Sequence, residues 1–118
     1  MKDNHNSHYK LVRETEVNYF LHRIKKHFPN FVAGVICDRN GFPIGSNISK
    51  RLWVHENRLS LLAVSKSKEL LNDPDLIQLK FDIDKEKNFK LFILLEKSTQ
   101  YKNGTKRIKN LIKSQDLF

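Results

Sequence analysis

Hydrophobic positions recur along the chain with two periods, and these periods predict three helices and four strands. From Val17 to Phe28 the apolar residues return at steps of three and four, which places them on one face of an α-helix. Pro29 ends this helix because the residue before a proline is driven out of the α region. A second amphipathic helix is predicted over 55–71 and ends in the same way before Pro74. A third helix opens with Thr105 as its N-cap, and its buried side is formed by Ile108, Leu111 and Ile112.

The remaining apolar segments have the two-residue period of β-strands. Segment 31–38 is apolar on both faces, which favours a central place in a sheet. Asn40-Gly41 follows it and is typical of a type I′ hairpin turn, in which both residues have positive φ. The return strand contains Pro43, which cannot donate a ladder hydrogen bond and therefore belongs at a free edge or a bulge. Alternation predicts that strand 77–83 is half exposed, whereas the additional apolar residues of 89–96 favour a more central position.

These elements define the fold class as α+β, an α-β-β-α-β-β-α sandwich around a central antiparallel sheet. No composition break divides the 118 residues, so we assign 14–118 to one domain and 1–13 to a flexible or weakly ordered N-terminal tail. No apolar stretch approaches the roughly 20 residues of a membrane-spanning helix. The N-terminus also lacks the apolar run of a signal peptide, and a cytoplasmic location is therefore expected.

The balance of charges changes this picture by indicating an acidic partner. The chain has 22 Lys and Arg against 13 Asp and Glu, a net charge of +9. Nucleic acid, anionic lipid and an acidic protein surface all fit this charge, and a Lys-rich composition also follows from the codon usage of an AT-rich genome. On the third helix Lys106, Lys109 and Lys113 form a stripe opposite the apolar side, which is either a solvated face or a docking surface. Trp53, before the second helix, is either a partner anchor or a ring that covers the core edge.

Candidate chemistry is sparse. The sequence contains no GxxxxGK[ST] phosphate loop, no HExxH, no paired-cysteine spacing and no GxSxG elbow. We therefore assign no catalytic, cofactor-binding or metal-binding residue and expect no small-molecule substrate. Cys37 lies within an apolar strand and is interpreted as a small core residue. His5 and His8 have no further ligands near them in the sequence, and we interpret them as part of a solvated tail.

The order of elements and one short motif resemble a known family. An amphipathic helix that ends at a proline is followed by an apolar strand running into 38–46, Asp-Arg-Asn-Gly-Phe-Pro-Ile-Gly-Ser, and then by the Leu-rich helix 55–71. This pattern resembles the roadblock family, the dynein light chain roadblock type of domain in the longin-like and profilin-like group. The resemblance covers the chain from about Glu14 onward. Roadblock domains usually have three strands after the second helix and five in all, whereas only two are found here, so either one strand is missing or segment 76–83 is divided differently.

The resemblance implies a non-enzymatic dimerisation or scaffold module. Such a module pairs with itself or with another roadblock-like chain through the second helices, and it binds or regulates a small Ras-like GTPase or joins a larger assembly. From helix position, we assign the dimer or partner surface to Leu59, Leu62, Ala63, Lys66 and Leu70. Because the first and last helices of the family pack side by side on the opposite face of the sheet, we expect a basic docking surface formed by Arg23, Lys25, Lys26, Lys106, Lys109 and Lys113. The alternative function is a basic nucleic-acid-binding module, and attachment to an anionic membrane through the lysine stripe is a third hypothesis.

Overall fold

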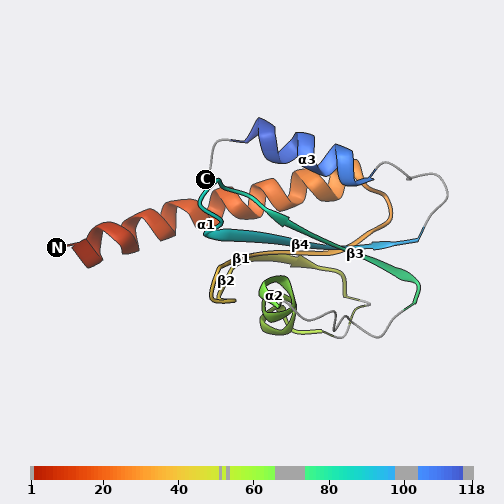
Figure 1. The fold of residues 1–118 in the computed structure, drawn as a ribbon, viewed down its shortest axis with the longest axis horizontal. Helices are drawn as coiled ribbons and strands as arrows, with labels where there is room; N and C mark the ends of the chain where they lie inside the picture. Colours follow the sequence, from red (N-terminus) through yellow and green to blue (C-terminus); the bar gives the residue numbers. More distant parts are fainter. Residues whose placement is uncertain (1, 51, 53, 66–73, 98–103, 116–118) are drawn as a thin grey trace.

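Seven elements follow one another in the predicted order (Figure 1). The computed structural model describes residues 2–50, 52, 54–65, 74–97 and 104–115, with side chains described from Glu14 onward within these ranges. The elements are α1 (Lys2–His27), β1 (Phe31–Asp38), β2 (Pro43–Ile48), α2 (Glu56–Val64), β3 (Leu76–Asp82), β4 (Phe89–Glu96) and α3 (Gly104–Ser114). Helices α1 and α3 cover one face of the sheet and α2 covers the other, which confirms the predicted α+β sandwich.

The four strands form one antiparallel sheet in the order β2-β1-β4-β3. The central place predicted for the two-sided apolar strand β1 is confirmed, and so is the inner position of β4. All five residues from Leu91 to Leu95 are buried. The described part of the chain therefore contains four strands, as the periodicity indicated, and β2 and β3 are the edges.

The position predicted for Pro43 is also confirmed. It lies on edge strand β2, where the register steps from Ile36 opposite Gly45 to Cys37 opposite Pro43. Ile44 is the extra residue of this irregularity, and a proline without an amide proton is tolerated beside it.

The type I′ turn predicted for Asn40-Gly41 is wrong. Gly41 has φ 88°, whereas no positive φ is found at Asn40. The amide of Gly41 donates to the Asp38 carbonyl at 3.0 Å, and the amide of Asp38 donates to the Phe42 carbonyl at 3.0 Å. Asp38 Oδ1 also accepts from the amides of Asn40 and Phe42 at 2.9 and 3.0 Å. An aspartate that caps its own turn favours a three-residue loop in which only the glycine is left-handed.

Two apolar cores lie on the two faces of the sheet. The first joins the predicted apolar stripe to alternate residues of β1 and β4 and to Ile108 of α3; the stripe consists of Val17, Phe20, Leu21 and Ile24 of α1 and of Phe28, which directly follows α1. The second lies under α2 and includes Val35, Cys37, Leu59 and Phe92. The helical period therefore identified the buried sides of α1 and α3 correctly.

The helix ends differ from the sequence prediction in three places. Helix α2 ends at Val64, because Ser65 is extended, with φ −66° and ψ 135°, and donates its amide to the Leu62 carbonyl. The prediction of a helix through 71 is thus wrong at Ser65, a residue type that competes poorly for helix interiors, and 66–71 lie outside the described residues. Thr105 is the second residue of α3 and not its N-cap. Helix α1 begins at Lys2 and runs across the predicted tail, and its first half extends beyond the sheet (Figure 1).

Candidate interaction surfaces

The predicted dimer surface on α2 includes two residues that face the sheet. Leu59 is fully buried and Ala63 is 5% exposed, while half-buried Leu62 packs against the same core. Lys66 and Leu70 lie outside the described residues. Leu59 and Ala63 are thus already enclosed within the chain and do not form an outer apolar surface. The large apolar residue that α2 exposes is Leu61, at 59%.

The β1–β2 hairpin holds α2 in place through close contacts. A Cβ added at Gly41 would lie 3.2 Å from both Leu61 and Val64, so the turn packs tightly on the helix. The Cys37 thiol donates to the Ser60 carbonyl at 3.6 Å, and Ser46 Oγ donates to Glu56 at 2.6 Å. Burial is the main reason that the pKa of Cys37 rises to about 12, with a contribution from the charge of Asp38. The thiol is protonated at neutral pH, as expected for a core residue.

A basic hollow lies between the end of α2 and the strands β3 and β4. It has a volume of about 380 Å³, and we call it the α2 hollow; its lining residues are Arg39, Ala63, Val64, Ser65, Lys80, Phe81, Asp82, Lys87 and Lys90. Strand alternation explains its charge, because Lys80 and Asp82 of β3 and Lys90 of β4 point to the α2 face. Four of the lining residues are cationic and one is acidic.

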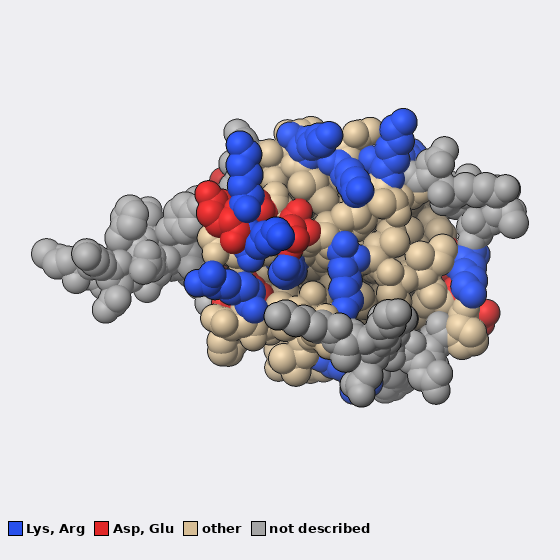
Figure 2. Space-filling model, viewed as in Figure 1, with Lys and Arg blue, Asp and Glu red and all other residues tan. Residues whose placement is uncertain are grey.

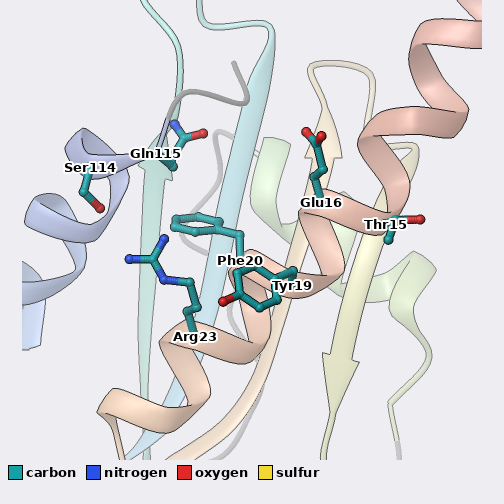
Figure 3. A pocket seen from close by; sticks show the side chains of 7 residues that line it. All are labelled: Thr15, Glu16, Tyr19, Phe20, Arg23, Ser114 and Gln115. Carbon is teal, nitrogen blue, oxygen red and sulfur yellow. The ribbon is translucent and has the colours of Figure 1, made fainter.

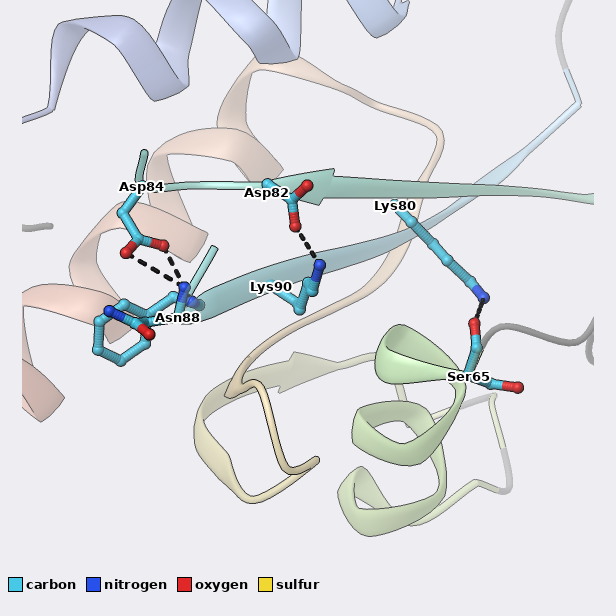
Figure 4. Close-up of polar contacts among 7 residues, drawn as sticks. Ser65, Lys80, Asp82, Asp84, Asn88 and Lys90 are labelled. Carbon is cyan, nitrogen blue, oxygen red and sulfur yellow. Dashed lines mark hydrogen bonds and ion pairs between the residues drawn. The ribbon is translucent and has the colours of Figure 1, made fainter. Parts of the chain in front are cut away.

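Polar contacts hold several of these side chains in place (Figure 4). Lys90 forms an ion pair with Asp82, its direct partner across the two strands. Lys80 Nζ donates to the Ser65 carbonyl at 3.3 Å, just beyond the end of α2. Asp84 accepts from the amides of Asn88 and Phe89, which fixes the β3–β4 loop, and Lys87 adopts φ 58° within it. Sequence analysis missed this hollow, although Lys80, Asp82 and Lys90 could have been placed on one face by strand alternation.

The residues of the predicted basic docking surface lie on the other side of the sheet. Lys25 and Lys26 of α1 are exposed, as are all three stripe lysines of α3, while Arg23 is half-buried. In Figure 2, Lys and Arg side chains gather along the edge of the molecule where α3 lies. The guanidinium of Arg107 in α3 lies 5.3 Å from the centre of the ring of Phe28, the residue that directly follows α1. The structure thus brings the six predicted residues onto one layer, and a docking role for them stays a prediction.

A groove of about 440 Å³ runs between α1 and the end of α3 (Figure 3). Its lining residues are Thr15, Glu16, Tyr19, Phe20, Arg23, Ser114 and Gln115. Tyr19 is 66% exposed although it adjoins buried Phe20. Its place off the apolar stripe of α1 was visible in the sequence, but sequence analysis did not select it.

The remaining sequence hypotheses concern Trp53, metal binding and a membrane-spanning helix. Trp53 and the side chains of His5 and His8 lie outside the described part of the structure. Within the part that is described, no three His, Cys, Asp or Glu residues gather where they could hold a metal ion. A search of the same residues found no helix long and apolar enough to cross a membrane.

Comparisons with protein-family models, with curated proteins and with solved structures found no match to this chain.

Proposed function

We propose that the chain is a non-enzymatic interaction module that pairs with itself or with another roadblock-like chain and docks a small Ras-like GTPase or a larger assembly. The observation that carries the proposal is the layer of α1 and α3, where exposed lysines from both helices share one side of the sheet. The element order is consistent with the resemblance seen in the sequence, whereas the sheet of the described residues has one strand fewer than roadblock domains usually have.

The stripe on α3 is the part of this layer best suited to an acidic surface. A helix rises 1.5 Å per residue, so Lys106, Lys109 and Lys113 span only about 10 Å along its axis. Like charges at this spacing repel one another in the free chain, and carboxylates of a partner relieve that repulsion. Such charges also speed association by steering an acidic partner toward the docking layer.

The first experiment measures mass and binding together. Light scattering after size exclusion gives the oligomeric state, and the immobilised chain is then probed with small Ras-like GTPases from the same cell, loaded with GTP or GDP. We expect a dimer, and binding that depends on the nucleotide. A strictly monomeric chain that binds no GTPase in either state would overturn the proposal.

Charge reversal locates the docking layer. The triple variant Lys106→Glu, Lys109→Glu, Lys113→Glu should weaken GTPase binding at least roughly tenfold, because charged pairs across interfaces govern association. The matched control reverses three exposed cations outside α1 and α3, Lys50→Glu, Arg58→Glu and Lys97→Glu. Equal loss in both variants would show that net charge alone controls binding and that α3 is not the docking element.

A second candidate function, single-stranded nucleic acid binding, is favoured by one observation. Exposed Tyr19 lies in the same groove as Arg23 (Figure 3), and bases stack on aromatic rings beside cations. Anisotropy with a labelled single-stranded oligonucleotide tests it over a salt series. Tyr19→Ala should then weaken binding by about 1–3 kcal/mol. Tight, salt-sensitive binding of this kind without any GTPase contact would favour the second function over the first.

A further inference from the structure

The α2 side of the molecule combines cations with protruding apolar side chains, and we propose that it is a docking face for an anionic lipid bilayer. This proposal is independent of GTPase docking on α1 and α3, because it uses the opposite layer of the sheet. We call this surface the hairpin face; it consists of Phe42, Leu61 and the cations of the α2 hollow, Arg39, Lys80, Lys87 and Lys90.

The apolar part of the hairpin face is unusually exposed. Phe42 is 64% and Leu61 59% exposed, and they are two of the three large hydrophobic side chains left exposed among the described residues. They belong to one region, because Gly41, next to Phe42, packs against both Leu61 and Val64. Val64 in turn lines the α2 hollow together with Arg39. The exposed apolar side chains therefore adjoin the cationic hollow.

Hydrogen bonds and an ion pair fix the positions of several cations of the hairpin face. Lys80 is bound to the Ser65 carbonyl, and Lys90 is paired with Asp82 (Figure 4). The loop that carries Lys87 is fixed by the two hydrogen bonds to Asp84. No ion pair to another described residue is found for Arg39 or Lys87. These two exposed cations can neutralise external anions without first breaking an internal pair.

The arrangement favours a bilayer over a peptide or a nucleic acid. A groove that binds a peptide helix takes the apolar side chains of the peptide into its own apolar lining, whereas the exposed apolar side chains of this face, Phe42 and Leu61, lie outside the lining of the hollow. A nucleic acid would use the cations and leave Leu61 exposed. An anionic bilayer accepts both parts, since apolar side chains enter the boundary between headgroups and acyl chains while Lys and Arg lie near the lipid phosphates.

Vesicle co-sedimentation of the whole chain tests the proposal. The probe is a vesicle of phosphatidylcholine and phosphatidylserine in a roughly 2:1 ratio, chosen because anionic lipid attracts basic surfaces. Pure phosphatidylcholine vesicles are the neutral comparison. We expect binding only to the anionic vesicles, and binding should fall as salt rises. The proposal would be overturned if the chain bound both kinds of vesicle equally or bound neither of them.

Two pairs of variants assign the binding to the hairpin face. Arg39→Gln with Lys87→Gln should lower partitioning by about 25-fold, about fivefold for each cation. Phe42→Ser with Leu61→Ser should lower it by at least about tenfold, because the inserted apolar area is lost. The controls are Tyr19→Ser, an equally exposed aromatic on the other layer, and Lys106→Gln with Lys109→Gln. Controls that lose as much binding as the test variants would contradict a localised site.

Other occupants of the face give different results. All substituted residues are exposed, so circular dichroism of each variant should match the original chain. If the Phe42/Leu61 variant changes the mass in light scattering and vesicle binding is unaffected, the face is a contact between chains and the lipid proposal fails. If polyglutamate binds at Arg39 and Lys87 while vesicles do not, the face takes an acidic protein and the lipid proposal fails as well.

Discussion

Replacing Gly45 with alanine should destabilise the fold, because β2 lies unusually close to α1 at this position. A Cβ at residue 45 would lie 2.6 Å from Cγ1 of Val17 and 2.7 Å from Oδ1 of Asn18, whereas ordinary contact begins at 3.4 Å. The Asn18 side chain is exposed and can turn away. Val17 is fully buried, so α1 and β2 must separate by about 0.8 Å, the difference between 2.6 and 3.4 Å.

The cost follows from known effects of overpacking. An extra methyl group in a well-packed core costs about 1–3 kcal/mol. Alanine recovers about 0.4–1 kcal/mol of this by restricting the unfolded chain. We therefore expect a net loss of about 1–2 kcal/mol in the free energy of unfolding. For a domain of this size that lowers Tm by roughly 4–8 °C, since 1 kcal/mol corresponds to about 4 °C.

Urea denaturation followed by far-ultraviolet circular dichroism measures the change. The control is Gly104→Ala, where the new Cβ would meet Phe28 and Leu95 at 3.5 and 3.6 Å, both ordinary contacts. Gly104 opens α3, so alanine there should leave stability unchanged or raise it by about 0.5–1 kcal/mol. If Gly45→Ala is as stable as the original chain, the close packing of α1 on β2 is refuted.

Three further predictions concern single side chains. Leu59→Ala should lower the free energy of unfolding by about 2–5 kcal/mol because it opens a cavity, whereas Leu61→Ala should change it by no more than about 0.5 kcal/mol. Similar urea midpoints for the two variants would contradict the orientation of α2, in which Leu59 faces the sheet. Asp38→Ala removes the acceptor of two amide hydrogen bonds and should lower the free energy of unfolding by about 1–2 kcal/mol. Hydrogen exchange at the Phe42 amide should become faster, and unchanged exchange would argue against the capped turn. The pKa of Cys37 is about 12 in the folded chain against an ordinary 9.0, so the thiol loses its proton at lower pH in the unfolded chain. The stability that the protonated thiol contributes is therefore complete below pH 9 and is lost as the pH rises to 12. Cys37→Ala should flatten that part of the decline in urea midpoints, and an unchanged slope would count against a buried thiol.

The layers of this fold could be predicted because the buried side of each element requires apolar residues at the spacing of a helix or a strand. Residues such as Val17 and Ile24 recur at helical spacing since one side of α1 must cover the sheet. The two apolar faces of β1 follow from its two neighbours and the helices above and below it. In such cases the physical cause is local and repeats along the element.

The orientation of α2 and the positions where helices and turns end were harder to predict, because they depend on individual side-chain contacts that a short sequence pattern does not indicate. The apolar arc of α2 is wide, and the sequence does not specify whether Leu59 or Leu61 meets the sheet. The turn after β1 was misassigned because the Asp38 carboxylate outweighed the preference of the dipeptide. The α2 hollow contains Arg39 from one hairpin and Lys87 from another, and these residues come together only when β4 pairs with β1.

The inner position of β4 also has a consequence for the order of folding. β1 pairs with β2 across a short turn, but its other neighbour follows about fifty residues later, with Val35 opposite Phe92. Two hairpins can therefore form from local contacts, whereas the sheet closes only when they join along β1 and β4. Joining them requires closing a long loop, and loop-closure entropy slows such steps. The seam between the hairpins is thus where the refolding rate is set, and mutations along it should slow refolding more than mutations at either sheet edge.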